Sequence, residues 1–170
     1  AGWKSMHFLL EYHSEGNGGA GALRDGYYYK ERNVPAMRAY ERFLKYVGVH
    51  TTSDPTSASH PTTARQFDLA NRLAEEMKAL GISDVRVDEH CYVYGVIPAT
   101  PGHESAHALG FIAHMDTTDD APGDNIKPIL HENYDGGDVT LPGSGATMHV
   151  ADFPFLAGMK GQTLITTDGT

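Results

Sequence analysis

The sequence predicts an α/β fold in which a mixed sheet is flanked by helices. Two segments between residues 37 and 80 carry apolar residues at helical spacing, and several short apolar or alternating segments follow them. Two helices followed by strands indicate a layered α/β domain, because an amphipathic helix buries its apolar stripe against another element.

The first predicted helix begins near Pro35 and ends at Gly48. Its apolar residues follow the i, i+3, i+4, i+7 spacing of one buried face: Tyr40, Phe43, Leu44 and Val47. We therefore expect this face to be buried.

The second predicted helix runs from about Thr62 or Thr63, either of which can cap it, to about Leu80. Gly81 occupies the position after its end, where a left-handed residue is common. The predicted buried face consists of Phe67, Leu69, Ala70, Leu73, Met77 and Leu80.

Strands are predicted where apolar residues alternate with polar ones or form short runs bounded by turn residues. The main candidates are residues 85–87, 92–97 and 106–113, and shorter ones are residues 129–131, 139–141 and 163–166. A turn is expected at Pro142–Gly145.

Residues 1–36 differ from the remainder and are predicted to be a flexible amino-terminal extension with no assigned function. Residues 15–21 are rich in glycine, as linkers are. The remaining residues, 37–170, are predicted to form the structured domain.

The composition excludes several classes of protein. Thirteen basic and 22 acidic residues give a net charge of -9, which disfavours a nucleic-acid partner. No apolar stretch is long enough to span a membrane, so no membrane partner is expected. The single cysteine, Cys91, excludes an internal disulfide and fits a reducing compartment, so a packing role and a cytoplasmic location are expected.

The strongest candidate for chemistry is the segment His114-Met115-Asp116. The apolar run Ala108–Ala113 predicts a buried strand, and alternation then places His114 and Asp116 on the same side. Histidine suits zinc, and a nearby carboxylate can fix its tautomer, so the pair is a plausible metal half-site. Taken by themselves, these three residues more often mark a solvated strand end.

Other polar residues are weaker candidates. Asp119, Asp120 and Asp124 lack calcium-loop spacing and are expected to form a solvated acidic loop. His149 and Asp152 superficially resemble a ligand pair, but a surface role is favoured. Hydrolase-elbow, Walker and dinucleotide motifs are absent from the sequence.

Three segments carry a family resemblance: Gly110–Thr117, Glu132–Val139 and Gly161–Thr170. In these segments the chain closely resembles peptidase T, a family of tripeptide aminopeptidases. The resemblance extends from near Met37 to Thr170. This family lies within the two-zinc exopeptidases, which also include carboxypeptidases and amino-acid deacylases.

The resemblance implies the amino-terminal part of a layered zinc-exopeptidase catalytic domain that acts on small peptides with two zinc ions. It makes His114 a zinc ligand and Asp116 the catalytic-site carboxylate that holds its imidazole. The family's other ligands and its general base have no match here, so the resemblance implies an amino-terminal fragment that is inactive alone. Two alternatives stay open: a related two-zinc dipeptidase or deacylase, and a non-catalytic domain of the same fold.

Overall fold

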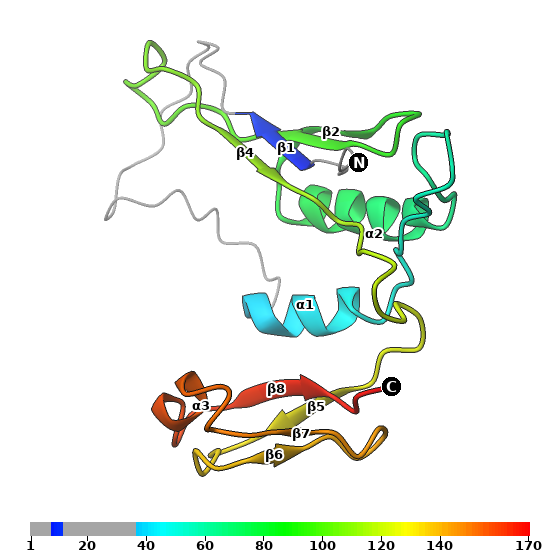
Figure 1. Ribbon diagram of the computed structural model, residues 1–170. Coiled ribbons are helices and arrows are strands. Elements are labelled where there is room, and N and C mark those ends of the chain that lie inside the picture. The colour runs from blue at the N-terminus through cyan, green and yellow to red at the C-terminus, as the bar shows by residue number, and fades with distance from the viewer. Residues whose placement is uncertain (1–7, 12–36) are drawn as a thin grey trace. The chain divides into compact units, whose positions relative to one another are not determined.

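The computed structural model describes residues 8–11 and 37–170, which group into two compact units (Figure 1). The first unit comprises Thr51–Asp119 with the described residues before Arg38, and the second comprises Arg38–His50 and Asp120–Thr170. The predicted division between residues 36 and 37 stays a prediction, and most of the predicted extension lies outside the described residues. The coarse α/β prediction is confirmed.

The first unit contains a four-stranded mixed sheet in the order β2-β3-β1-β4. Its strands are β1 (Phe8–Glu11), β2 (Ser83–Val87), β3 (Val93–Val96) and β4 (Gly110–Ala113). β1 runs parallel to β3 and antiparallel to β4, and β2 and β3 form an antiparallel hairpin. β1 falls in the segment that was expected to be a flexible extension.

Helix α2 (Gln66–Ala79) packs against β2 and β3. The predicted buried face is correct at Leu69, Ala70 and Met77, whereas Leu80 is 54% exposed. The helix ends as predicted, because Gly81 has a φ of 81° and Ile82 N–H reaches back to the Met77 carbonyl.

The predicted cap of α2 is wrong. The N-cap is Arg65, without a side-chain cap hydrogen bond. The threonine hydroxyls are used elsewhere: Thr62 Oγ1 accepts from the Asp54 N–H at 3.2 Å, and Thr63 Oγ1 donates to the Thr52 carbonyl at 3.2 Å. Both hydroxyls therefore bond to the preceding loop, and neither caps the backbone of the helix.

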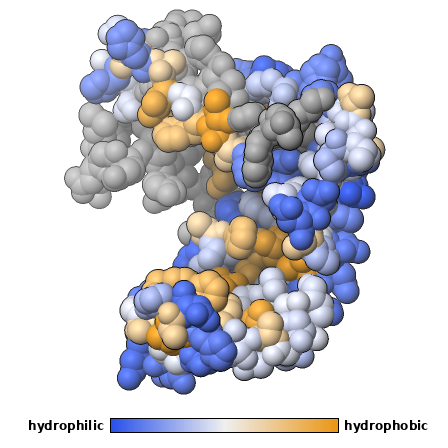
Figure 2. Space-filling model, viewed as in Figure 1, coloured by the Kyte–Doolittle hydropathy of each residue, from blue (hydrophilic) through white to orange (hydrophobic). Residues whose placement is uncertain are grey.

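The strand that leads to His114 is present, but the prediction that it is buried is wrong. All four residues of β4 are exposed, including Phe111 at 59% and Ile112 at 60%. α2 packs on β2 and β3, so the apolar side chains of β4 remain at the surface of this unit (orange in Figure 2).

The second unit is built from two small antiparallel sheets and two short helices. β5 (Pro128–His131) pairs with β8 (Leu164–Thr167), and β6 (Val139–Thr140) pairs with β7 (Thr147–Met148). The helices are α1 (Ala39–Tyr46) and α3 (Phe155–Gly158). β7 and α3 were not predicted, because elements of two to four residues leave little periodicity.

The core of the second unit is a cluster of buried apolar residues: Tyr134, Val139, Leu156 and Leu164. α1 contributes no buried residue, and Phe43 is 56% exposed, so the predicted buried face of this helix is wrong. In the part of the chain that the structure describes, none of the helices has the length and apolar character that a membrane crossing requires.

Candidate active site

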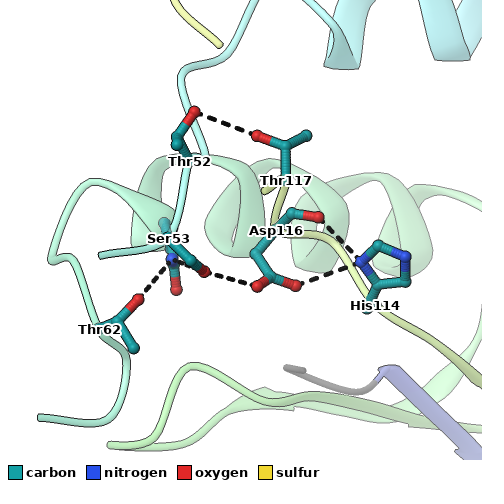
Figure 3. A network of polar contacts seen from close by, with 7 residues as sticks. Thr52, Ser53, Thr62, His114, Asp116 and Thr117 are labelled. Atoms are coloured by element: carbon teal, nitrogen blue, oxygen red, sulfur yellow. Dashed lines mark hydrogen bonds and ion pairs between the residues drawn. The ribbon is translucent and has the colours of Figure 1, made fainter. Parts of the chain in front are cut away.

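His114 and Asp116 lie directly after β4, which ends at Ala113, and their side chains contact each other (Figure 3). The Nδ1 atom of His114 lies 2.8 Å from the main-chain oxygen of Asp116 and 3.2 Å from its carboxylate Oδ1. The His114 side chain is 63% exposed, whereas that of Asp116 is 11% exposed. The carboxylate is therefore held inside the unit while the imidazole reaches its surface.

This geometry decides which ring nitrogen is available. A carbonyl oxygen and an ionised carboxylate only accept hydrogen bonds, so Nδ1 of a neutral His114 carries the proton. Nε2 then keeps its lone pair. A histidine held in this way through one nitrogen by a carboxylate or carbonyl is the usual arrangement of a metal ligand.

The carboxylate of Asp116 has a second partner from a distant part of the sequence. Ser53 Oγ donates to Asp116 Oδ2 at 2.6 Å, across a sequence separation of 63 residues. The amide Nε2 of Gln66, the first residue of α2, donates to Ser53 Oγ at 3.1 Å and to Thr62 Oγ1 at 3.3 Å. Two loops and the start of α2 therefore meet behind the His-X-Asp segment. Figure 3 shows the contacts among Ser53, Asp116 and His114.

The loop that carries Ser53 is fastened to the His-X-Asp segment by its backbone. Ser53 N–H donates to the Thr117 carbonyl at 3.0 Å, and the hydroxyls of Thr52 and Thr117 lie 3.1 Å apart. The Thr52 carbonyl also accepts from Arg65 Nη2 at 2.8 Å. These bonds fix the position of Ser53 relative to Asp116.

Sequence reasoning missed Ser53 and Gln66. Nothing local marks Ser53, which lies in a polar loop. Gln66 did leave a signal: it precedes Leu69 and Ala70 by three and four residues, so it occupies a core position of α2, and it is 1% exposed. A polar residue at a core position must satisfy its hydrogen bonds internally.

The side chains near His114 provide a single candidate metal ligand, the His114 imidazole. Imidazole nitrogen suits zinc, but a tetrahedral zinc site needs four ligands. Within residues 8–11 and 37–170, no group of three or more His, Cys, Asp or Glu side chains is arranged to hold a metal ion. The described residues therefore supply one candidate ligand and its supporting carboxylate.

His149 and His131 have local partners of their own. His149 pairs with Asp138 rather than with Asp152: its Nδ1 lies 2.7 Å from Asp138 Oδ2. The hydrogen bond with Asp138 raises the pKa of His149, and the same bond lowers the pKa of Asp138. His131 contacts Thr166 Oγ1 across the β5–β8 pair at 3.0 Å.

Fold and site together describe an α/β protein that presents a His-X-Asp pair at the end of an apolar strand. No protein-family model matches the chain. Curated proteins, however, match it closely, and the three named next are all peptidase T enzymes.

The chain is 48% identical over 132 residues to peptidase T of Alkaliphilus oremlandii. It is 47% identical over 131 residues to that of Geobacillus kaustophilus, and 49% identical over 131 residues to that of Desulfitobacterium hafniense. Each match covers 76% of this chain and 32% of the relative, so the chain spans about a third of the length of these enzymes. The predicted resemblance to peptidase T is confirmed.

Proposed function

We propose that this chain forms part of a metallo-aminopeptidase of the peptidase T type, which releases the amino-terminal residue of tripeptides. The observation that carries the proposal is the 47–49% identity to peptidase T enzymes over three quarters of the chain. The chain also carries the His-X-Asp pair, His114 and Asp116. The exposed side chain of His114, whose Nδ1 is held by Asp116, supports the same proposal.

In this proposal the domain is the amino-terminal part of a layered zinc-exopeptidase fold, and its complete site holds two zinc ions. Such ions lower the pKa of a bound water and polarise the scissile carbonyl. Of this chain's residues, His114 would be one ligand through Nε2. Asp116 would keep the imidazole in the Nδ1–H form, which leaves the lone pair on Nε2 for the metal.

The proposed substrate is a small peptide, with no nucleic-acid or membrane partner. A cytoplasmic location is proposed because Cys91 is a free, buried thiol, which suits a reducing compartment. The excess of acidic residues supports the absence of a nucleic-acid partner.

A chimera tests the proposal directly. Residues 37–170 replace the matching segment of the Geobacillus kaustophilus enzyme, and the product is assayed with tripeptides, dipeptides and N-acyl amino acids. We expect cleavage of tripeptides that a zinc chelator abolishes. Preference for dipeptides or acyl amino acids would support the related hydrolases instead, and a folded chimera without any activity would support the non-catalytic alternative.

The role of His114 is tested in the same chimera. We expect His114→Ala to abolish activity and to lower the zinc content, because one ligand is lost. His149→Ala is the matched control, since His149 is also an exposed histidine paired with an aspartate, and it should have little effect. Full activity of the His114→Ala chimera would remove the proposed ligand.

A further inference from the structure

The hydrogen bonds behind His114 have only one consistent direction. The Gln66 amide nitrogen can only donate, and the Asp116 carboxylate can only accept. Ser53 has one hydroxyl proton, which it gives to Asp116 at 2.6 Å, so it accepts from Gln66 at 3.1 Å. The series therefore runs from Gln66 through Ser53 to Asp116, which in turn accepts from Nδ1–H of His114.

The inner end of this series is buried and its outer end is exposed. Gln66 is 1% exposed, the Asp116 side chain 11% and the His114 side chain 63%. Groups in the interior are held by packing and by several hydrogen bonds, whereas an exposed imidazole has few restraints of its own. The interior end therefore fixes the Asp116 carboxylate, and the carboxylate restrains the ring.

We propose that Ser53 and Gln66 are positioning residues that orient the Asp116 carboxylate and thereby keep His114 in the Nδ1–H tautomer with Nε2 available to a metal. The role of this arrangement in catalysis rests on the function proposed above, whereas the hydrogen bonds themselves are present in this chain. Without the Ser53 hydroxyl, the carboxylate loses the bond that fixes Oδ2. The ring then approaches the behaviour of free histidine, which favours the Nε2–H tautomer in water.

The tautomer can be measured without any metal or activity. Two-bond ¹H–¹⁵N correlation spectra of the metal-free full chain distinguish Nδ1–H from Nε2–H, and His114→Gln assigns the His114 signals. The spectra are compared for the neutral ring, because the two tautomers differ only in that form. We expect the Nδ1–H form of His114 to predominate in the unaltered chain.

Ser53→Ala should lower the ratio of Nδ1–H to Nε2–H at His114 by roughly threefold or more, because a bond to a charged group is lost. Gln66→Met, which is similar in size but lacks the amide, should change the ratio in the same direction. Ser53→Thr keeps the hydroxyl and should restore the ratio. Ser57→Ala, in the same loop, is the matched control, because the Ser57 hydroxyl contacts the Ser59 hydroxyl and amide instead of Asp116. An unchanged His131 signal shows that each variant is folded.

An unaltered tautomer ratio in folded Ser53→Ala overturns the proposal, since the Asp116 main-chain oxygen alone would then fix the ring. A predominant Nε2–H form in the unaltered chain overturns it as well. The two proposals fail separately. If Ser53→Ala shifts the ratio while the folded, otherwise unaltered chimera cleaves no tripeptide, positioning stands and the proposed function falls; an active chimera with an unshifted ratio rejects positioning alone.

Discussion

Asp138 and His149 form an ion pair in which Nδ1 lies 2.7 Å from Oδ2, while Asp138 Oδ1 accepts from the Val150 N–H at 2.8 Å. One carboxylate thus joins the end of the Asn133–Asp138 segment to the residues that follow β7. Because both side chains are about half exposed, the pair tethers two segments at the surface of the second unit.

We predict a pH dependence from this pair. The pKa of His149 is raised from 6.5, so its contribution to stability is complete below 6.5 and is lost as the pH rises through the raised value. The pKa of Asp138 is lowered from 3.8, so its contribution is complete above 3.8 and is lost as the pH falls through the lowered value. The pair therefore stabilises the chain between these limits.

The measurement is an NMR titration of His149 with and without Asp138→Asn, which removes the charge. The pKa of His149 should fall toward 6.5 in the variant. Asp152→Asn is the control and should have a smaller effect, because Asp152 acts on His149 only through its charge at a distance. An equal fall in both variants would contradict the ion pair.

Gly95 of β3 allows α2 to approach the sheet. A Cβ at this position would collide with the Met77 methyl group and would lie 2.6 Å from Cγ2 of Ile82. Gly95→Ala should therefore destabilise the chain by about 1–3 kcal/mol, the usual cost of overpacking. Denaturant unfolding measures this change, with Gly158→Ala as the control because its added Cβ meets open space. Equal stability of the two variants would show that α2 does not pack there.

Asp88 closes the hairpin between β2 and β3. Its Oδ1 accepts from the N–H groups of His90 and Tyr92 at 3.0 and 2.8 Å. Asp88→Ala should lower the free energy of unfolding by about 1–2 kcal/mol, because two turn amides lose their partner. The neighbouring Glu89→Ala, which removes only a 3.8 Å contact with His90, should cost much less. Hydrogen exchange at the Tyr92 amide should accelerate in Asp88→Ala alone.

Cys91 should react slowly with thiol reagents in the native chain. It is fully buried, and burial raises the pKa of its thiol from 9.0 to about 11, which leaves roughly a hundredfold less thiolate at mildly alkaline pH. As the single cysteine of the chain, it gives an unambiguous rate with a disulfide reagent. The rate should rise sharply in denaturant. Equally fast modification in native buffer would show that this thiol is accessible.

The 170-residue chain by itself should bind zinc weakly and hydrolyse no tripeptide. Its described residues bring together one imidazole and one supporting carboxylate near β4, which is too few donors for a stable zinc site. Calorimetric titration with zinc and a tripeptide assay of the isolated chain test this expectation. Tight one-to-one binding that His114→Ala removes would contradict it.

Local features of this protein were readable from the sequence alone. The spacing of apolar residues located α2, and Gly81 marked its end. Both signals are local, because one face of a helix recurs every three to four residues and a helix often ends at a glycine in the left-handed conformation. The short spacing of His114 and Asp116 likewise indicated that the two side chains are neighbours, and the motif segments identified the resemblance to peptidase T.

Only the tertiary structure decided which surfaces are buried and which distant residues meet. β4 has an apolar pattern but exposed side chains, and α1 has an apolar face but no buried residue, because burial depends on which element packs against them. Ser53 reaches Asp116 across 63 residues, and His149 pairs with Asp138 instead of Asp152. Such contacts arise when loops bring separate segments together, and no local pattern encodes the distance between them.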